Sequence, residues 1–458
     1  METPFEIAGP TSPYAAGIDQ RYLLVPAFEL ECGVRLQNAP VAFQTWGRLD
    51  AATRANVVLV CHPISGSANV AEWWGPLFGP GRTLDTNRFL VVCCNVIGSP
   101  YGTASPVTRR GGEQVHDGVW TRAPHVGARD AVPQDSWWGA AFPPTTVRDD
   151  VRLHKHVLEY LGVEQLACVL GGSMGGMESL EWPLCFPVRY PRGADALVRT
   201  TSNDKPYVRQ AVLLASAARQ SPWCIAWSEI QRRAIEVDPR FREGTYPPHD
   251  QPAAGLAAAR MCALMTYRQP QSFERRFSRT RARTNRPRGT PAPAAALSGA
   301  SSLMEEENDD GATPVATSAA PQQREQYAVQ SYLHHQGAKF VQRFDALCYV
   351  HLTLKLDSHD ASTGRAAWLA TPPADDTTCL RGVLHCLGAS AVAPRILILS
   401  VTSDLLYAPE EQHFMHENIP HSQLVNIVSA EGHDGFLLEY PQIERAINAF
   451  LPPPAAHL

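Results

Sequence analysis

Residues 171–175 read Gly-Gly-Ser-Met-Gly and follow an apolar run, Leu-Ala-Cys-Val-Leu, at 166–170. A glycine two residues to either side of a serine lets the backbone turn sharply from a strand into a helix, and the turn lifts the hydroxyl clear of the sheet. The pattern alone can arise by chance, as a glycine-rich loop with an incidental serine. Here a strand-like run precedes it and a helix-forming stretch, 177–182, follows it. The segment therefore predicts a nucleophilic serine, Ser173, at a strand-to-helix turn.

Further apolar runs on both sides of this segment predict a mostly parallel sheet. Near-continuous apolar runs are typical of strands that are buried on both faces. A helix is expected from Thr146, because Asp149 three residues later completes a capping-box pattern. Strands that alternate with helices imply an α/β fold with helices on both faces of the sheet. The expected strands are 56–61, 89–94, 166–170, 210–215, 394–400 and 423–428.

Between residues 222 and 349 the pattern changes to helices without strands, and we expect a helical lid there, inserted into a sheet domain formed by 1–221 and 350–458. Within the lid, 278–322 is rich in Arg, Pro, Ala, Ser and acidic residues, so we expect it to be disordered. An arginine run at 275–288 suggests a nucleic-acid patch, but the acidic residues that follow it favour a solvated loop. Two other stretches, 107–138 and 188–209, are expected to be surface insertions.

Composition and charge argue against several classes of protein. The chain has 458 residues, 44% of them hydrophobic, and a net charge of -5, which gives no reason to expect nucleic acid or an anionic membrane as a partner. No apolar stretch approaches the length of a membrane span, and the first residues lack the pattern of a signal peptide, so we expect a cytoplasmic protein. The eleven cysteines show no paired metal-type spacing, which favours buried free thiols and predicts no metal site.

A serine nucleophile needs a base that takes its proton and an acid that holds the base in the working tautomer. On this kind of sheet the chain order is serine, acid, histidine, each just past the end of a strand. Asp404 and His433 follow the last two predicted strands in that order. Taken singly, such an aspartate is more often a turn residue and such a histidine a loop residue. Their common order and placement predict a triad of Ser173, Asp404 and His433.

The oxyanion of an acyl-transfer intermediate is expected to be bound by two backbone amides. One is the amide of Met174, directly after the serine. The other comes from the loop after the strand at 56–61, which begins His62-Pro63-Ile64. Because proline has no N–H to donate, Ile64 is the better candidate.

With these residues in place, most of the chain resembles the homoserine O-acetyltransferase family of α/β-hydrolase enzymes, and within it the fungal branch. The resemblance implies transfer of an acetyl group from acetyl-CoA, as a co-substrate, to the hydroxyl of L-homoserine in methionine synthesis. It also implies a ping-pong route through acetyl-Ser173, no permanently bound cofactor, and a homodimer. The matching stretches are 65–71, 73–74, 95–102, 171–182, 221–229, 251–252, 255–261, 331–333, 339–340, 343–345, 403–404 and 432–434.

In this family an arginine of the lid and the aspartate after the catalytic histidine contact the amino-acid substrate, and these match Arg260 and Asp434. The chemistry agrees, since arginine offers a bidentate fork for a carboxylate and aspartate accepts hydrogen bonds from an ammonium group. The alternatives are a solvated arginine on a helix and an aspartate that only structures its loop.

The sequence departs from the family pattern at Pro63, at Asn69 and at 346–348, where Ala-Leu-Cys replaces a more polar stretch. Relatives act on L-serine or deacetylcephalosporin C, or use succinyl-CoA, and one methylene in a pocket changes binding by only about 1–3 kcal/mol. Serine and homoserine therefore both remain open as acceptors, as do acetyl and succinyl donors. An esterase or a non-catalytic binding protein with the same fold is the third alternative.

Overall fold

The computed structural model describes residues 3–8, 12–112, 115–116, 119–120, 137–187, 189–192, 196–199, 205–281, 327–389 and 393–451. In this part of the chain a nine-stranded sheet has the order β1-β2-β3-β5-β4-β8-β11-β12-β13. The pairs from β1 to β5 are antiparallel and those from β5 to β13 are parallel. The strands are β1 (Phe5–Ile7), β2 (Arg21–Glu29), β3 (Arg35–Trp46), β4 (Val57–Cys61), β5 (Leu90–Cys94), β8 (Leu166–Gly172), β11 (Gln210–Leu214), β12 (Arg395–Val401) and β13 (Gln423–Ile427).

The six predicted strands are confirmed as β4, β5, β8, β11, β12 and β13. The three antiparallel strands β1–β3 were not predicted. Two short hairpins, β6 (Val115–His116) with β7 (Val119–Trp120) and β9 (Arg189–Arg192) with β10 (Ala196–Arg199), fall in the expected insertions. The other residues of 113–136 and 188–204 lie outside the described part.

Helices cover both faces of the sheet, because alternate residues of the buried strands point to opposite sides. On one face Val57 and Leu59 pack with side chains of α2 (Val147–Tyr160), α3 (Met174–Cys185), α9 (Asp376–Gly388) and α10 (Pro409–Asn418). On the other face Val58 and Val60 pack with α1 (Val70–Trp74), α11 (Gly435–Leu438) and α12 (Tyr440–Phe450). The predicted cap of α2 is present, since Thr146 and Asp149 exchange both capping-box hydrogen bonds.

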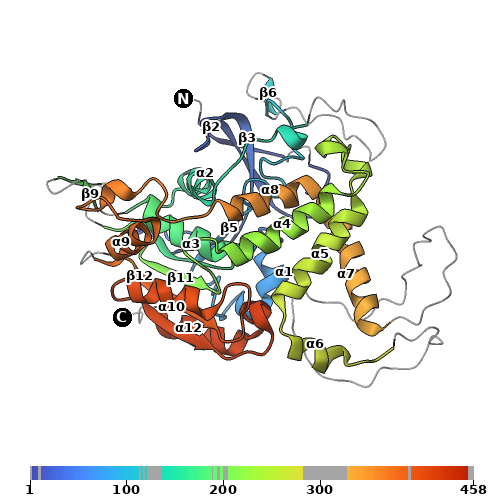
Figure 1. Ribbon diagram of the computed structural model, residues 1–458. Coiled ribbons are helices and arrows are strands. Elements are labelled where there is room, and N and C mark those ends of the chain that lie inside the picture. Colours follow the sequence, from blue (N-terminus) through green and yellow to red (C-terminus); the bar gives the residue numbers. More distant parts are fainter. Residues whose placement is uncertain are drawn as a thin grey trace.

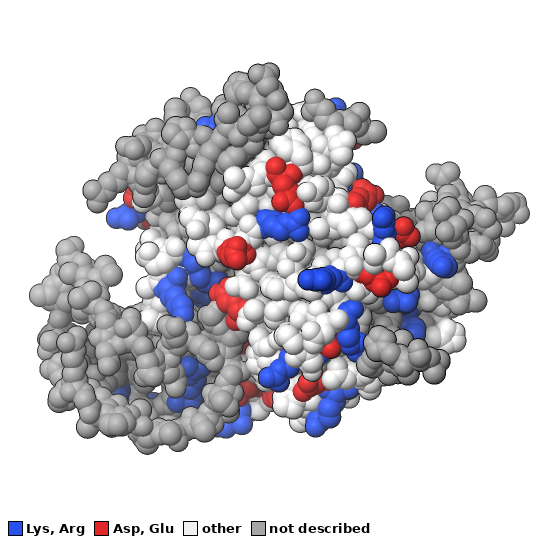
Figure 2. All heavy atoms as spheres, turned by 180° about the vertical axis from the view of Figure 1, so that it is seen from behind, with Lys and Arg blue, Asp and Glu red and all other residues white. Residues whose placement is uncertain are grey.

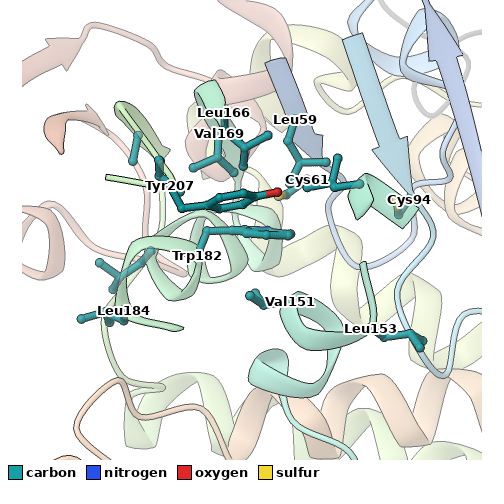
Figure 3. Close-up of a cluster of buried hydrophobic side chains, with 14 of the residues drawn as sticks. Leu59, Cys61, Cys94, Val151, Leu153, Leu166, Val169, Trp182, Leu184 and Tyr207 are labelled. Carbon is teal, nitrogen blue, oxygen red and sulfur yellow. The ribbon is translucent and has the colours of Figure 1, made fainter. Parts of the chain in front are cut away.

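Figure 3 shows the core on the α3 side, where the rings of Trp182 and Tyr207 lie close to Leu166 and Val169 of β8. The two rings are stacked with centroids 6.2 Å apart. This packing fixes α3 against the sheet, and the start of α3 is the turn that carries Ser173.

The helices α4 (Pro222–Glu236), α5 (Ala253–Tyr267), α6 (Pro270–Phe277), α7 (Ala328–Arg343) and α8 (Ala346–Asp357) come between β11 and β12. Figure 1 shows α4, α5 and α7 together at one side of the molecule. Their core includes Leu256 and Phe340 and reaches Met174 and Met177 at the start of α3. The segment between β11 and β12 is thus helical where described, and it contacts the turn at Ser173. The stretch predicted to be disordered, 278–322, lies outside the described residues from 282 onward.

Among the described residues, no helix is both long and apolar enough to cross a bilayer, and no group of His, Cys, Asp and Glu side chains has the arrangement of a metal site. All eleven cysteines are free, and those in the central strands, Cys61, Cys93, Cys94 and Cys168, are buried. On the face seen in Figure 2, basic and acidic side chains are interspersed rather than gathered by sign.

Candidate active site

Ser173 lies between the last residue of β8 and the first residue of α3, as the sequence predicts. Its backbone has φ 58° and ψ -124°, a conformation that costs a residue with a side chain about 1–3 kcal/mol. Hydrogen bonds hold it there: its amide donates to the Leu214 carbonyl (3.0 Å), and its carbonyl accepts from Gly176 N (2.9 Å) and from Ser216 Oγ (2.8 Å). The turn therefore fixes the serine by its backbone.

The glycines around Ser173 permit contacts that no side chain would allow. A Cβ at Gly175 would lie 2.1 Å from the Cys61 carbonyl oxygen, and a Cβ at Gly172 would lie 2.3 Å from the ring of Phe436. The start of α3 is thus pressed against the end of β4, and the segment after His433 is pressed against the end of β8. These close approaches explain why the motif needs glycine.

Asp404 and His433 are joined by a hydrogen bond of 2.7 Å between Oδ2 and Nδ1. The other carboxylate oxygen of Asp404 accepts from the amides of Leu406 (2.8 Å) and Tyr407 (2.9 Å). With Nδ1 donating to the carboxylate, Nε2 of His433 is left as the proton acceptor. Both groups are buried, and the acid is oriented by the backbone of its own turn.

Phe436 connects the turn of Ser173 to this pair. The ring of Phe436 contacts Gly172, the residue before the serine, and its centroid is 5.1 Å from that of His433. A hydrogen bond between Ser173 Oγ and His433 is not among those of the described residues. Catalytic hydrogen bonds are often long before substrate binds. The structure thus joins the acid to the base, and Phe436 contacts both the base and the residue before the serine.

The two amides predicted for the oxyanion lie on adjoining segments, because Met174 begins α3 and Ile64 follows the end of β4. Neither amide has a hydrogen-bond partner among the described residues. His62, which sequence analysis did not assign a role, holds the second segment. Its Nδ1 lies 2.8 Å from the Pro63 carbonyl, and its Nε2 accepts from Val96 N at 3.1 Å. Burial lowers the pKa of His62 to about 4, so the ring is neutral and both contacts are kept at neutral pH.

Arg260 of α5 is only 4% exposed, and its guanidinium lies over the rings of Phe340 (4.9 Å) and Tyr267 (5.8 Å). Its Nη1 is buried and has no hydrogen-bond partner among the described residues. A buried cation with an open donor is costly unless an anion binds to it. Arg260 is therefore suited to receive a carboxylate, and it is not the solvated arginine of the alternative interpretation.

Asp434 is buried next to His433, and the structure gives it a partner that sequence analysis missed. Arg268, at the end of α5, places Nε 2.6 Å from Asp434 Oδ2 and also pairs with Glu431. Burial raises the pKa of Asp434, while the positive charges of Arg268, His433 and Arg260 act to lower it. Asp434 thus lies within electrostatic reach of both Arg260 and the catalytic base.

Arg343 of α7 is a second missed residue. Its Nη1 donates to the Ser65 carbonyl at 3.3 Å and to the Tyr101 hydroxyl at 3.1 Å. Ser65 follows Ile64 directly, so this arginine ties the helical segment to the oxyanion loop. A sequence signal existed, because the residue lies in a family-like stretch, but the stretch did not reveal its partner.

A pocket of about 450 Å³ lies beside the site, lined by side chains of α4, α5, α6 and the Leu405 turn, among them Trp223, Trp227 and Phe273. Arg268 contributes to its wall, whereas Ser173, Asp404 and His433 do not line it. Arg268 therefore faces both this pocket and the carboxylate of Asp434.

Comparison with known proteins gives the chain its relatives. A family model described as the alpha/beta hydrolase fold matches residues 56–440. Homoserine O-acetyltransferase FUB5 of Gibberella fujikuroi is 40% identical, with 97% of this chain and 91% of the relative covered. The homoserine O-acetyltransferase of Schizosaccharomyces pombe is 38% identical (94% and 86% covered), and that of Salinibacter ruber is 40% identical (93% and 96% covered).

Among solved structures, a homoserine O-acetyltransferase from Bacillus anthracis has a TM-score of 0.66 at 18% identity, with 99% of each chain covered. The esterase E22 also has a TM-score of 0.66, at 21% identity, with 95% of this chain and 100% of that chain covered. At such low identity these likenesses establish the fold alone. Transferases and esterases share it, so the choice between them depends on the site.

Proposed function

We infer the reaction from one premise: the chain belongs to the homoserine O-acetyltransferase family of the α/β-hydrolase fold. We propose that it transfers the acetyl group of acetyl-CoA to the hydroxyl of L-homoserine, in methionine synthesis. The observation that supports this most is that Arg260, a buried cation with an open donor, lies within electrostatic reach of Asp434, a buried carboxylate next to His433. Opposite charges within electrostatic reach of each other suit an amino acid, whose carboxylate and ammonium groups flank one carbon.

In the first half-reaction, Ser173 Oγ attacks the thioester carbon and gives its proton to His433 Nε2. The amides of Ile64 and Met174 stabilise the oxyanion that forms. The C–S bond then breaks, and the CoA thiolate takes the proton from His433. Asp404 holds the imidazole in the required tautomer and stabilises its charged form.

In the second half-reaction, His433 removes the proton of the acceptor hydroxyl, whose oxygen attacks the acetyl-serine. The ester bond to Ser173 breaks, and Oγ takes back the proton from His433. Arg260 would hold the acceptor's carboxylate and Asp434 its ammonium group, so that the hydroxyl is aimed at the acyl carbon. No permanently bound cofactor takes part in this scheme.

An acyl-serine can also lose its acyl group to water, and a solved esterase shares this fold. An esterase is therefore the competing function. The burial of the site argues against hydrolysis: Ser173 is 7% and His433 3% exposed, and the helices between β11 and β12 pack against Met174 and His433. A covered site disfavours hydrolysis. L-Serine as acceptor and succinyl-CoA as donor remain alternatives within the transferase reaction.

We further propose a cytoplasmic homodimer whose partners are small molecules, without nucleic acid or membrane. Large apolar side chains on α4 and at its end, Trp223, Ile230 and Val237, are exposed at seven-residue spacing, as a helix that packs against a second copy requires. Sedimentation of the purified protein tests the dimer.

The decisive experiment measures CoA release from acetyl-CoA with homoserine, with serine and without acceptor, in the wild type and in Ser173→Ala. We expect homoserine-dependent release in the wild type and its loss in Ser173→Ala, because the acyl group then has no attachment point. Release at the full rate without acceptor would identify an esterase. A preference for serine would change the acceptor, and retained activity in Ser173→Ala would remove the proposed nucleophile.

A further inference from the structure

The junction between α5 and α6 carries a cluster of charges that lies against the loop of His433. Arg268 pairs with both Asp434 and Glu431, and Arg275 of α6 pairs with Glu431 at 3.1 Å. The Ser272 hydroxyl also donates to Glu431. One guanidinium, that of Arg268, therefore bridges the two carboxylates of the loop, while Arg275 contacts only the outer one.

The backbone holds Arg268 in register with this loop. Gly432 has φ +68°, and a Cβ at this position would lie 2.8 Å from the Tyr267 carbonyl oxygen and 3.1 Å from the backbone of Arg268. The loop that carries His433 and Asp434 thus rests directly on the end of α5. The backbone position of Arg268 therefore places its side chain within reach of Asp434.

The two carboxylate oxygens of Asp434 differ. Oδ2 is buried and forms an ion pair with Arg268 Nε at 2.6 Å. Neither oxygen accepts a hydrogen bond among those of the described residues, so Oδ1 keeps its full capacity to accept one. We propose that Arg268 is a positioning residue for the acceptor: it fixes one oxygen of Asp434 and leaves the other aimed at the acceptor's ammonium group. This inference rests on the proposed function, and it makes Arg268 a determinant of specificity for amino acids.

The charges around Asp434 explain why such a partner is needed. Burial raises the pKa of its carboxyl group, and Arg268 is the first of the charges that oppose this, before His433 and Arg260. Tyr267 at the end of α5 is within electrostatic reach of Asp434, and Glu431 lies on the same loop as Asp434 and pairs with Arg268. Without Arg268, Asp434 would therefore become protonated at a higher pH than in the wild type, and a neutral carboxyl group binds an ammonium ion poorly.

The test compares two acceptors that differ only in the amino group, L-homoserine and 4-hydroxybutanoate, in the wild type and in Arg268→Gln. In Arg268→Gln we expect kcat/KM for homoserine to fall about tenfold or more. In the pH profile of kcat/KM, the fall on the acid side should move up by about one pH unit, because a nearby opposite charge lowers a carboxyl pKa by roughly 1–3 units. The value for 4-hydroxybutanoate should change little. Single-turnover CoA release from acetyl-CoA, which needs no acceptor, should also stay near wild type.

Arg275→Gln is the matched control, because Arg275 shares Glu431 with Arg268 but makes no contact with Asp434, and it is 60% exposed. This variant should keep the wild-type ratio between the two acceptors. Arg268→Lys should recover part of the ratio, since it restores a charge, and it provides a second variant in case Arg268→Gln folds poorly.

The inference is overturned if Arg268→Gln lowers kcat/KM for both acceptors equally, or if Arg275→Gln changes the ratio as much, since either result would show that the cluster only anchors the loop. Failure of the proposed function would look different: the wild type itself would show no homoserine-dependent CoA release.

Discussion

The active site has two halves that are held in different ways. The core half, Ser173, Asp404 and His433, follows strand ends, and backbone hydrogen bonds and close glycine contacts set its geometry. The lid half, Arg260, Arg268 and Arg343, comes from α5–α7, and aromatic rings, carboxylates and a carbonyl hold its guanidinium groups. The core half thus suits bond making, which tolerates little displacement, and the lid half suits recognition of a charged substrate.

The comparison predicts that damage to the core half affects both half-reactions. In Asp404→Asn the amides of Leu406 and Tyr407 would retain the side-chain oxygen, so the NH₂ group would face His433 Nδ1. The imidazole would then carry its proton on Nε2 and could not accept one from Ser173. We expect acylation and acetyl transfer each to fall by about 10³–10⁴-fold, measured by single-turnover CoA release and by steady-state assay.

A fall in only one half-reaction of Asp404→Asn would contradict this division. A wild-type melting temperature in the variant would show that the loss is chemical rather than structural.

The two arginines of the lid half that lie near the acceptor site, Arg260 and Arg268, should affect the second half-reaction alone. Arg260→Met keeps a long apolar side chain between the rings of Phe340 and Tyr267 but removes the donor for the acceptor's carboxylate. We expect kcat/KM for homoserine to fall about 100-fold, since a charge-assisted bond to a desolvated partner contributes about 1.5–3 kcal/mol. Acylation by acetyl-CoA should stay within about twofold. Equal losses in both half-reactions would place Arg260 with the core half.

The smallest expected effect concerns stability. Burial keeps two histidines of the described chain neutral: His62 before the oxyanion loop, and His351 on α8, whose Nε2 is 2.8 Å from Thr145 Oγ1. Burial lowers the pKa of His351 to about 3. Between that pH and about 6.5 the unfolded chain binds a proton that the folded chain does not, so stability is lost as the pH falls through this window.

His351→Gln removes this proton while offering Thr145 a similar partner. Its free energy of unfolding should therefore decline less steeply on acidification, by up to about 1.4 kcal/mol per pH unit. Denaturant titrations between pH 5 and pH 8 measure the slope. If the slope of the variant equals that of the wild type, another group carries the acid sensitivity.

The same division explains what the sequence could predict. The turn at Ser173 was predicted because its strand, glycines and helix are contiguous, and Asp404 and His433 because each follows a recognisable strand. The ion pair between Arg268 and Glu431 joins residues 163 positions apart, and each partner resembles an ordinary surface charge. Its existence depends on how the lid packs, which no local pattern encodes.

The antiparallel strands β2 and β3 escaped prediction for a different reason. Each contains a proline, Pro26 and Pro40, and proline within a run argues against a strand because it cannot donate to the ladder. Both strands lie on the antiparallel side of the sheet, away from the parallel strands that carry the site. The missed part of the fold therefore did not affect the prediction of the core half.

The backbone conformation at Ser173 serves the chemistry of the molecule but lowers its stability. Glycine adopts a positive φ without the strain that serine bears there, so the folded chain would gain stability from Ser173→Gly, a replacement that removes its nucleophile. A selection that rewarded only heat resistance or yield would favour that replacement. Directed evolution of this chain for robustness should therefore retain a screen for turnover in every round.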